Sequence, residues 1–273
     1  MLGMSLLDFI GEVPDEDVAE RWLIKQRWPS GMTCPTCGSS HVRRLRGRRL
    51  FQCRCRRQFS VTSGSAMHGT RLPLRAWAVG IFLFVTSSKG ISARKMSAWL
   101  GISYKAAWFM GHRIRAMMAA WRPLSGIVEI DEAYYGTRRR KPGRGAGPAL
   151  VMVAVERSGD AVARAIQSHG RVYIADALKG VLSKDSVIMT DGLPAYRCLG
   201  GRSVRHSAGE FVRGEVHVNT AEGFNGLFKR AVTGVYHWIS VKHADRYAAE
   251  AAFRWSERRL CSGTPMPYGT LVG

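Results

Sequence analysis

The chain has 273 residues, 46% of them hydrophobic, which is enough for one large domain or two to three smaller ones. Its formal net charge of +21 is uneven, because residues 21–128 contain twenty Lys and Arg but no Asp or Glu. A polyanionic partner would offset that charge, so nucleic-acid binding is favoured over a generally basic soluble protein. The longest apolar run, Ala76–Val85, is about half of a membrane span, and the first residues lack a signal-peptide pattern. We therefore expect no membrane partner and a cytoplasmic protein that acts at the nucleoid.

Residues 1–30 predict a short helical lead-in. Asp15, Glu16 and Asp17 come before apolar residues at helical spacing, and acids suit the first turn of a helix. The Pro29–Gly31 stretch should end this segment.

Two cysteine pairs in residues 31–66 predict a zinc ribbon. Cys34 and Cys37 form a C-x2-C pair, Cys53 and Cys55 form a C-x-C pair, and fifteen residues separate the two pairs. Four thiolates in two pairs suit one structural Zn²⁺, which would stabilise a segment too small to fold on its own core. A single intervening residue constrains chelation, so His41 is an alternative ligand. Two chance pairs of reduced cysteines are the remaining alternative.

Eight arginines lie between residues 43 and 57, around the cysteine pairs. Guanidinium groups suit phosphate contacts, so this segment is a candidate DNA-binding surface. The candidate residues are Arg43, Arg44 and Arg46.

Residues 67–122 predict a helical region with a helix-turn-helix layout. Leu74–Val85 is apolar nearly all round, which indicates a buried helix. Two further helices, Ile91–Leu100 and Tyr104–Met118, are separated by the turn former Gly101 and the N-cap candidate Ser103. An ordinary helical hairpin is the alternative. The second helix would present Tyr104, Lys105, Trp108, His112 and Arg113 toward DNA.

Beyond a linker at residues 123–126, the pattern changes to alternating strands and helices. This alternation is typical of a mixed α/β sheet flanked by helices, and we assign it to residues 123–262, with a tail at 263–273. Strands are expected at Ile127–Ile130, Ala149–Val155, Ala161–Ile166, Ser186–Thr190 and near Val204–His206. Helices are expected at Tyr173–Leu182, through Ala195 and Tyr196, at Thr220–Arg230 and at Val241–Arg259.

Three acids stand out in this second part of the chain. Asp131 and Asp191 each follow a short apolar strand, and Glu222 opens a predicted helix. Carboxylates that converge in this way can hold the two divalent cations of phosphoryl transfer, for which Mg²⁺ is suited. Lys229 follows Glu222 by about two helical turns, so both should lie on one helix face.

Each acid also has a structural alternative. Asp131 and Asp191 are plausible turn residues, and Asn219 with Glu222 has the spacing of a capping box. Within the first strand, Glu129 shares a face with Asp131 and is its nearest competitor, whereas Glu132 should point elsewhere.

The ordered blocks RWPSGMTCPTCGS, FQCRCRRQFSVTSGS, VEIDEAYYG, IMTDGLPAY and HVNTAEGFNGLFKR resemble bacterial insertion-sequence transposases of the zinc-ribbon group related to the Merlin transposons. The resemblance runs nearly end to end. It implies a ribonuclease H-like catalytic core with a D-D-E or D-D-N acid set, carried here by Asp131, Asp191 and Glu222, with Lys229 behind them. Asn219 is a second candidate for the third member. The resemblance also implies Cys34, Cys37, Cys53 and Cys55 as zinc ligands, although the second pair departs from the usual C-x2-C spacing.

This resemblance implies a DNA transposase that binds the terminal repeats of its element and uses Mg²⁺ or Mn²⁺ for 3′-end cleavage and strand transfer. Two DNA ends must be held together, so a homodimer or larger assembly is expected. A DNA-binding regulator without catalysis and a ribonuclease H-like nuclease are the alternatives. A basic loop is expected to follow the DNA backbone through Arg138, Arg139, Arg140 and Lys141.

Overall fold

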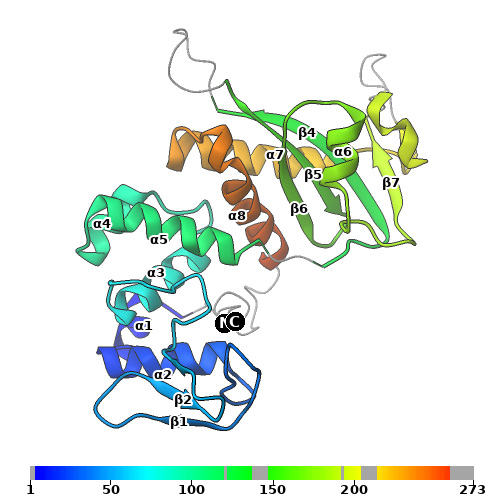
Figure 1. Cartoon of the computed structure of the whole chain (residues 1–273). Coiled ribbons are helices and arrows are strands. Elements are labelled where there is room, and N and C mark those ends of the chain that lie inside the picture. Colours follow the sequence, from blue (N-terminus) through cyan, green and yellow to red (C-terminus); the bar gives the residue numbers. More distant parts are fainter. Residues whose placement is uncertain (1–3, 120–121, 137–146, 192–193, 204–213, 259–273) are drawn as a thin grey trace. The chain divides into compact units, whose positions relative to one another are not determined.

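The computed structural model describes residues 4–119, 122–136, 147–191, 194–203 and 214–258 (Figure 1). The chain divides into two units, the first running to Met118 and the second starting at Ala119. Each unit is described by itself. Within the described residues, we find no helix with the length and apolar character needed to cross a membrane.

The predicted lead-in of the first unit consists of two helices, α1 (Leu6–Glu12) and α2 (Glu16–Arg27). Asp15 caps α2, because its side chain accepts hydrogen bonds from the backbone N–H groups of Asp17 (2.9 Å) and Val18 (2.8 Å). The acids near residue 16 therefore start a helix, as their sequence pattern predicts.

A three-stranded antiparallel sheet follows, in the order β1 (Val42–Arg44), β2 (Phe51–Cys53) and β3 (Gln58–Phe59). Its apolar core is small and is completed from α2. The buried residues are Cys34, Phe51, Cys53 and Phe59, with Ile24, Trp28, Met32 and Val42 packed against them.

Three helices complete the first unit: α3 (Leu74–Thr86), α4 (Ala93–Leu100) and α5 (Tyr104–Met117). The apolar α3 is buried over most of its surface, as predicted. It begins after Pro73 without a capping side chain of its own. Instead, the Glu16 carboxylate accepts hydrogen bonds from the N–H groups of Leu74 and Arg75, both at 2.9 Å, so α2 and α3 are joined at this point.

The turn between α4 and α5 has the expected chemistry. Gly101 ends α4 in the left-handed conformation (φ 63°), and the Ser103 side chain caps α5 by accepting a hydrogen bond from Ala106 N–H (3.2 Å). Tyr104 and Lys105 are exposed at the start of α5. The prediction for His112 is wrong, because this side chain is buried.

His112 is only 2% exposed, and its ring lies against Trp108 with centroids 4.1 Å apart. It falls between Met110 and Ile114 on the side of α5 that packs into the core. Its burial depends on which side of α5 meets the core, and not on the polarity of the imidazole.

The second unit contains a five-stranded sheet in the order β6-β5-β4-β7-β8. Strand β4 pairs antiparallel with β5 and parallel with β7; β5 and β6 are antiparallel, and β7 and β8 are parallel. This order and these directions form a ribonuclease H-like mixed sheet, which confirms the predicted fold class. The strands are β4 (Ile127–Tyr135), β5 (Ala149–Glu156), β6 (Ala161–Ile166), β7 (Val187–Thr190) and β8 (Arg202–Ser203).

Strand β4 is longer than predicted, so Asp131 lies within it rather than at its end. The pairing with β5 extends from Val128 opposite Glu156 to Tyr135 opposite Ala149, and this partner stabilises the additional residues. The last strand lies at Arg202–Ser203, and the expected position near Val204–His206 falls outside the described residues.

Helices cover both faces of this sheet (Figure 1). Val128 and Ile130 of β4 face a core that includes residues of α6, whereas Tyr135 faces a core formed with α7 and α8. Alternate residues of β4 therefore belong to opposite layers. The helical segments are α6 (Arg171–Ala177), the 3₁₀ turn η1 (Pro194–Leu199), α7 (Asn219–Ala231), the π-helical turn η3 (Val232–Tyr236), the 3₁₀ turn η4 (Val241–His243) and α8 (Ala244–Glu257).

Candidate functional site

The four predicted zinc ligands converge in the first unit. The Sγ atoms of Cys34, Cys37, Cys53 and Cys55 all lie within 4.8 Å of one another, with 3.9 Å between Cys34 and Cys55 and 3.6 Å between Cys37 and Cys53. Tetrahedral Zn²⁺ with Zn–S bonds of about 2.3 Å places its sulfurs roughly 3.8 Å apart. The four sulfurs therefore form a cluster of the size and composition that suits tetrahedral Zn²⁺. His41 is not a member of this cluster.

Two tight turns bring the cysteine pairs together. In the first turn Gly38 N–H donates to Cys34 O (2.8 Å), and in the second Arg56 N–H donates to Cys53 O (2.9 Å). The residue after the second cysteine of each pair is left-handed, with φ 71° at Gly38 and φ 67° at Arg56. Arg56 thus adopts at the C-x-C pair the conformation that Gly38 adopts at the C-x2-C pair.

The two predicted catalytic aspartates come from neighbouring strands. Ile130 of β4 lies opposite Thr190 of β7 in a parallel register, and each aspartate is the next residue along its chain. Asp131 and Asp191 are therefore neighbours across the β4–β7 pair. Burial raises the pKa of Asp131 to about 6, and the charges of Glu132 and Asp191 contribute to the increase. Negative charge thus accumulates where a cation site is predicted.

Asn225 is a further polar residue of this site that the sequence did not identify. It is 4% exposed, on the face of α7 that packs against the sheet. Its Nδ2 donates a hydrogen bond to Asp131 Oδ2 (2.7 Å), and its Oδ1 accepts one from the Tyr135 hydroxyl. Burial raises the pKa of Tyr135, so its phenol stays protonated and orients the amide. The available signal was an Asn among the apolar positions of an amphipathic helix.

The other candidates on α7 have a different environment. Asn219, Glu222 and Lys229 are exposed. Glu222 precedes Asn225 by three residues and Lys229 follows it by four, so all three belong to one side of the helix. In the described part of the chain, Asp131, Asp191 and Glu222 do not form a ligand cluster as tight as that of the cysteines.

The capping-box alternative for Glu222 is wrong. Helix α7 follows Val218 and has no capping hydrogen bond from a nearby side chain. Its N-terminus is instead capped from β4 by Glu129, which accepts hydrogen bonds from Thr220 N–H (2.6 Å), Thr220 Oγ1 (3.0 Å) and Ala221 N–H (3.1 Å).

Glu129 is fully buried and forms an ion pair with Arg157, with 2.5 Å between Oε1 and Nε. Its carboxylate is therefore occupied in fixing α7 to the sheet. Glu132 lies on the opposite face of β4, as expected, where it contacts His169 Nδ1 (3.1 Å) and accepts a hydrogen bond from the Tyr196 hydroxyl. Both glutamates are therefore engaged in other contacts and do not replace Asp131 as the first candidate acid.

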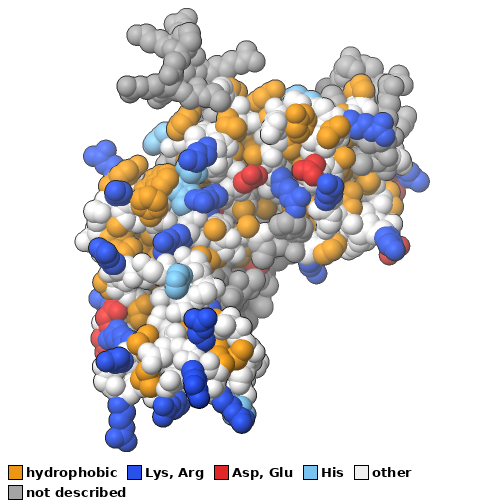
Figure 2. Space-filling view, viewed as in Figure 1, with side chains coloured by type: hydrophobic (Ala, Val, Ile, Leu, Met, Phe, Trp, Pro, Cys, Tyr) orange, Lys and Arg blue, Asp and Glu red, His pale blue; other side chains and the backbone are white. Residues whose placement is uncertain are grey.

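Lys and Arg side chains are abundant on the face seen in Figure 2. The predicted DNA-binding residues differ in their contacts and exposure. Arg44 forms an ion pair with Glu20 (2.7 Å), whereas Arg43 donates a hydrogen bond to the neutral Gln52 (2.7 Å). Arg46 and Lys105 are exposed, and Arg113 donates to His68 O (3.0 Å). The predicted loop residues Arg138, Arg139, Arg140 and Lys141 lie outside the described residues.

A ribonuclease H-like sheet with two adjacent aspartates, in a chain that also has a four-cysteine ribbon, defines the class of this protein as a DDE-type nuclease or transposase. Comparison with known proteins narrows this class. Residues 123–256 match the ISXO2-like transposase domain, and residues 14–58 match the transposase zinc-ribbon domain. The chain belongs to the ISXO2-like transposase family, which confirms the resemblance seen in its motifs.

A relative is found in an archaeal mobile element. The chain is 30% identical over 245 residues to a protein of the transposable element ISH50 of Halobacterium salinarum. The match covers 78% of this chain and 81% of the relative, and therefore spans both units.

Proposed function

We propose that this transposase binds the terminal inverted repeats of its insertion sequence, cuts the 3′ ends and transfers them into target DNA. The observation that carries the proposal is the adjacency of Asp131 and Asp191 on the parallel strands β4 and β7 of a ribonuclease H-like sheet. The family match supports the same activity.

The donor set suits Mg²⁺ or Mn²⁺. Carboxylate oxygens are the preferred ligands of these ions. Burial and the neighbouring charges of Glu132 and Asp191 raise the pKa of Asp131, and a bound divalent cation would favour its ionised form. Asp131 and Asp191 would hold the ions with Glu222, or with Asn219 as the alternative third member. When bound, such ions polarise the phosphate and activate the attacking oxygen.

Residues of the chain itself organise this site. Asn225 restrains one oxygen of Asp131, and Glu129 fixes the N-terminus of the helix that carries Asn219 and Glu222. Lys229, on the same side of α7, would contact a DNA phosphate. Pre-organised groups of this kind lower the reorganisation needed at the moment of reaction.

The first unit would deliver the DNA. Its zinc ribbon and the helix-turn-helix of α4 and α5 would recognise the terminal repeat. Both ends of the element must be cut in one event, so a homodimer or larger assembly would act on DNA.

The test is the variant Asp191→Asn in the full-length protein, assayed with a duplex that carries the element end. We expect loss of Mg²⁺-dependent cleavage with unchanged end binding. Asp185→Asn is the matched control, because Asp185 is exposed and lies just before β7. Equal loss of binding and cleavage in Asp191→Asn would refute the assignment.

Two further outcomes separate the alternatives. A wild-type protein that binds the ends but never cuts them with Mg²⁺ or Mn²⁺ would be a regulator. Cleavage without joined products would identify a nuclease.

A further inference from the structure

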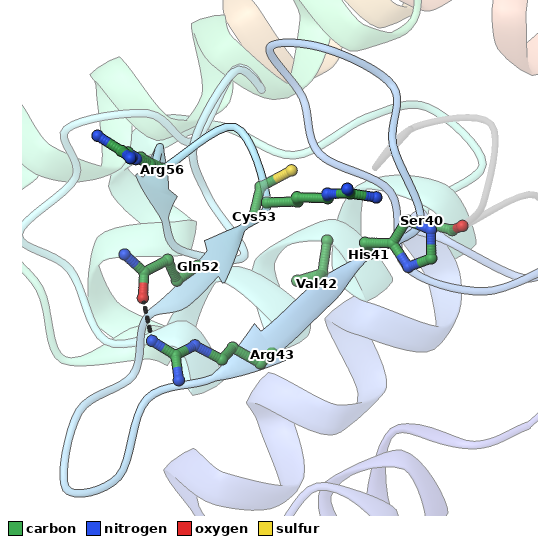
Figure 3. Close-up of a pocket in the computed structure, with 8 residues that line it drawn as sticks. Ser40, His41, Val42, Arg43, Gln52, Cys53 and Arg56 are labelled. Carbon is green, nitrogen blue, oxygen red and sulfur yellow. Dashed lines mark hydrogen bonds between the residues drawn. The ribbon is translucent and has the colours of Figure 1, made fainter.

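A hollow of about 610 Å³ lies on the zinc ribbon, over strands β1 and β2 (Figure 3). It contains three arginines and a histidine and no acidic residue. The lining includes His41, Arg43, Gln52, Arg54 and Arg56. A concave surface with this charge suits an anionic ligand.

Two arginines of the ribbon that lie outside the hollow are paired with acids. Arg44 is paired with Glu20, and Arg49 is paired with Glu16 (3.1 Å) and Asp17 (2.7 Å), all three acids belonging to α2. Among the described residues, no acid forms an ion pair with the arginines of the hollow. In this part of the chain, the three arginines of the hollow are therefore not compensated by an acid, in contrast to Arg44 and Arg49.

Arg43 is held in place at this surface. It lies opposite Gln52 in the β1–β2 register, and its Nη2 donates a hydrogen bond to Gln52 Oε1 at 2.7 Å. The bond restrains the guanidinium and leaves its other N–H groups for an external acceptor. A restrained donor loses less conformational entropy on binding than a mobile one.

Arg56 occupies a backbone conformation in which glycine would be less strained. Its φ of 67° matches that of Gly38 (φ 71°), the equivalent residue of the first cysteine turn. A side chain retained in the left-handed region carries a conformational cost that glycine avoids. Arg56 lines the hollow, so its side chain can contact a ligand that binds there.

We propose that this hollow is the surface of the ribbon that binds duplex DNA of the terminal repeat, through phosphate contacts from Arg43, Arg54 and Arg56. The inference rests on the proposed function and specifies which face of the ribbon performs it. It separates these three arginines from Arg44 and Arg49, which join the ribbon to α2.

The experiment measures binding of the zinc-loaded, full-length protein to an end duplex by fluorescence anisotropy at several salt concentrations. Arg43→Ala, Arg54→Ala and Arg56→Ala should each weaken binding about fivefold to tenfold and make the salt dependence less steep by roughly one phosphate contact. Arg49→Ala removes the same charge from the same ribbon and is the matched control. It should stay within about twofold of wild type, as expected for a residue without a phosphate contact.

Arg56→Gly separates binding from folding. Glycine relieves the left-handed strain, so this variant should keep the thermal stability of the wild type while it loses as much affinity as Arg56→Ala. Wild-type affinity in Arg56→Gly, or an equal loss in Arg49→Ala, would overturn the inference. If the wild type itself binds no DNA at any salt concentration, the proposed function fails instead.

Discussion

Asn225 Nδ2 lies 2.7 Å from Asp131 Oδ2, so the first candidate catalytic aspartate is contacted by a neutral amide of α7. The amide is itself oriented by the Tyr135 hydroxyl. One oxygen of Asp131 is thereby engaged by the helix, and the carboxylate plane is restrained before any metal or DNA arrives.

Replacing Asn225 with Ala should raise the Mg²⁺ concentration needed for half-maximal cleavage, because the Asp131 carboxylate loses its restraint. It should also lower the free energy of unfolding by about 1–3 kcal/mol, since the buried Tyr135 hydroxyl loses its acceptor. A Mg²⁺ titration of cleavage and a denaturant titration would measure the two effects. Leu227→Ala is the control, because Leu227 is on the same helix but 45% exposed. A Mg²⁺ requirement equal in both variants would contradict this role.

Glu129→Gln should destabilise the second unit by about 2–4 kcal/mol. The change keeps the shape of the side chain but leaves the largely buried Arg157 without its counter-ion and weakens the cap of α7. Denaturant unfolding is the measurement. As a comparison, Arg122→Ala breaks an exposed ion pair with Asp160 and should cost at most about 1 kcal/mol. Similar losses of unfolding free energy in the two variants would show that the burial of Glu129 does not determine how much its ion pair stabilises the fold.

One Zn²⁺ should co-purify with each chain and be lost on treatment with a strong chelator. Cys55→Ser should lower the zinc content, because Cys55 completes the four-thiolate cluster. His41→Ala should retain it, since His41 lies outside that cluster. Metal analysis by mass spectrometry checks both variants. Zinc loss from His41→Ala alone would contradict the four-cysteine assignment.

The metal-free protein should become less stable as the pH rises from about 4 to about 6. Burial raises the pKa of Asp131 to about 6 in the folded chain, above the ordinary 3.8, so folding favours its protonated form. The stabilising contribution of protonated Asp131 is present below pH 4 and is lost as the pH rises through 6. Asp131→Asn should therefore raise the melting temperature more at pH 7.5 than at pH 4. An equal increase in melting temperature at both pH values would exclude ionisation of Asp131 as the cause.

Local sequence patterns predicted much of the first unit because its helices follow local rules. Ser103 caps α5 and Gly101 ends α4, as their residue types indicate. Helix α3 lies within one residue of its apolar run. The fate of His112 could not be predicted in this way, because its burial depends on which side of α5 meets the rest of the core.

The second unit shows what local patterns leave out. The length of β4 is set by its pairing with β5, a partner that lies in another part of the chain. The roles of Glu129 and Asn225 depend on contacts across about ninety residues of sequence, between β4 and α7. The sequence motifs predicted the two aspartates as site residues. The hydrogen bond from Asn225 to Asp131 could be recognised only from the packing of α7 on the sheet.

Glu16 has a consequence for how this family can be recombined. Its carboxylate caps α3 through Leu74 and Arg75 and also contacts Arg49 of the ribbon, so a single side chain connects three segments. A chimaera that exchanges only the cysteine-bearing strands keeps the cap of α3 but replaces the segment that carries Arg49, and with it the contact to Glu16. The smallest segment that could be transplanted between relatives therefore starts before α2 and extends past Arg75, so that the ribbon and the first turn of α3 move together.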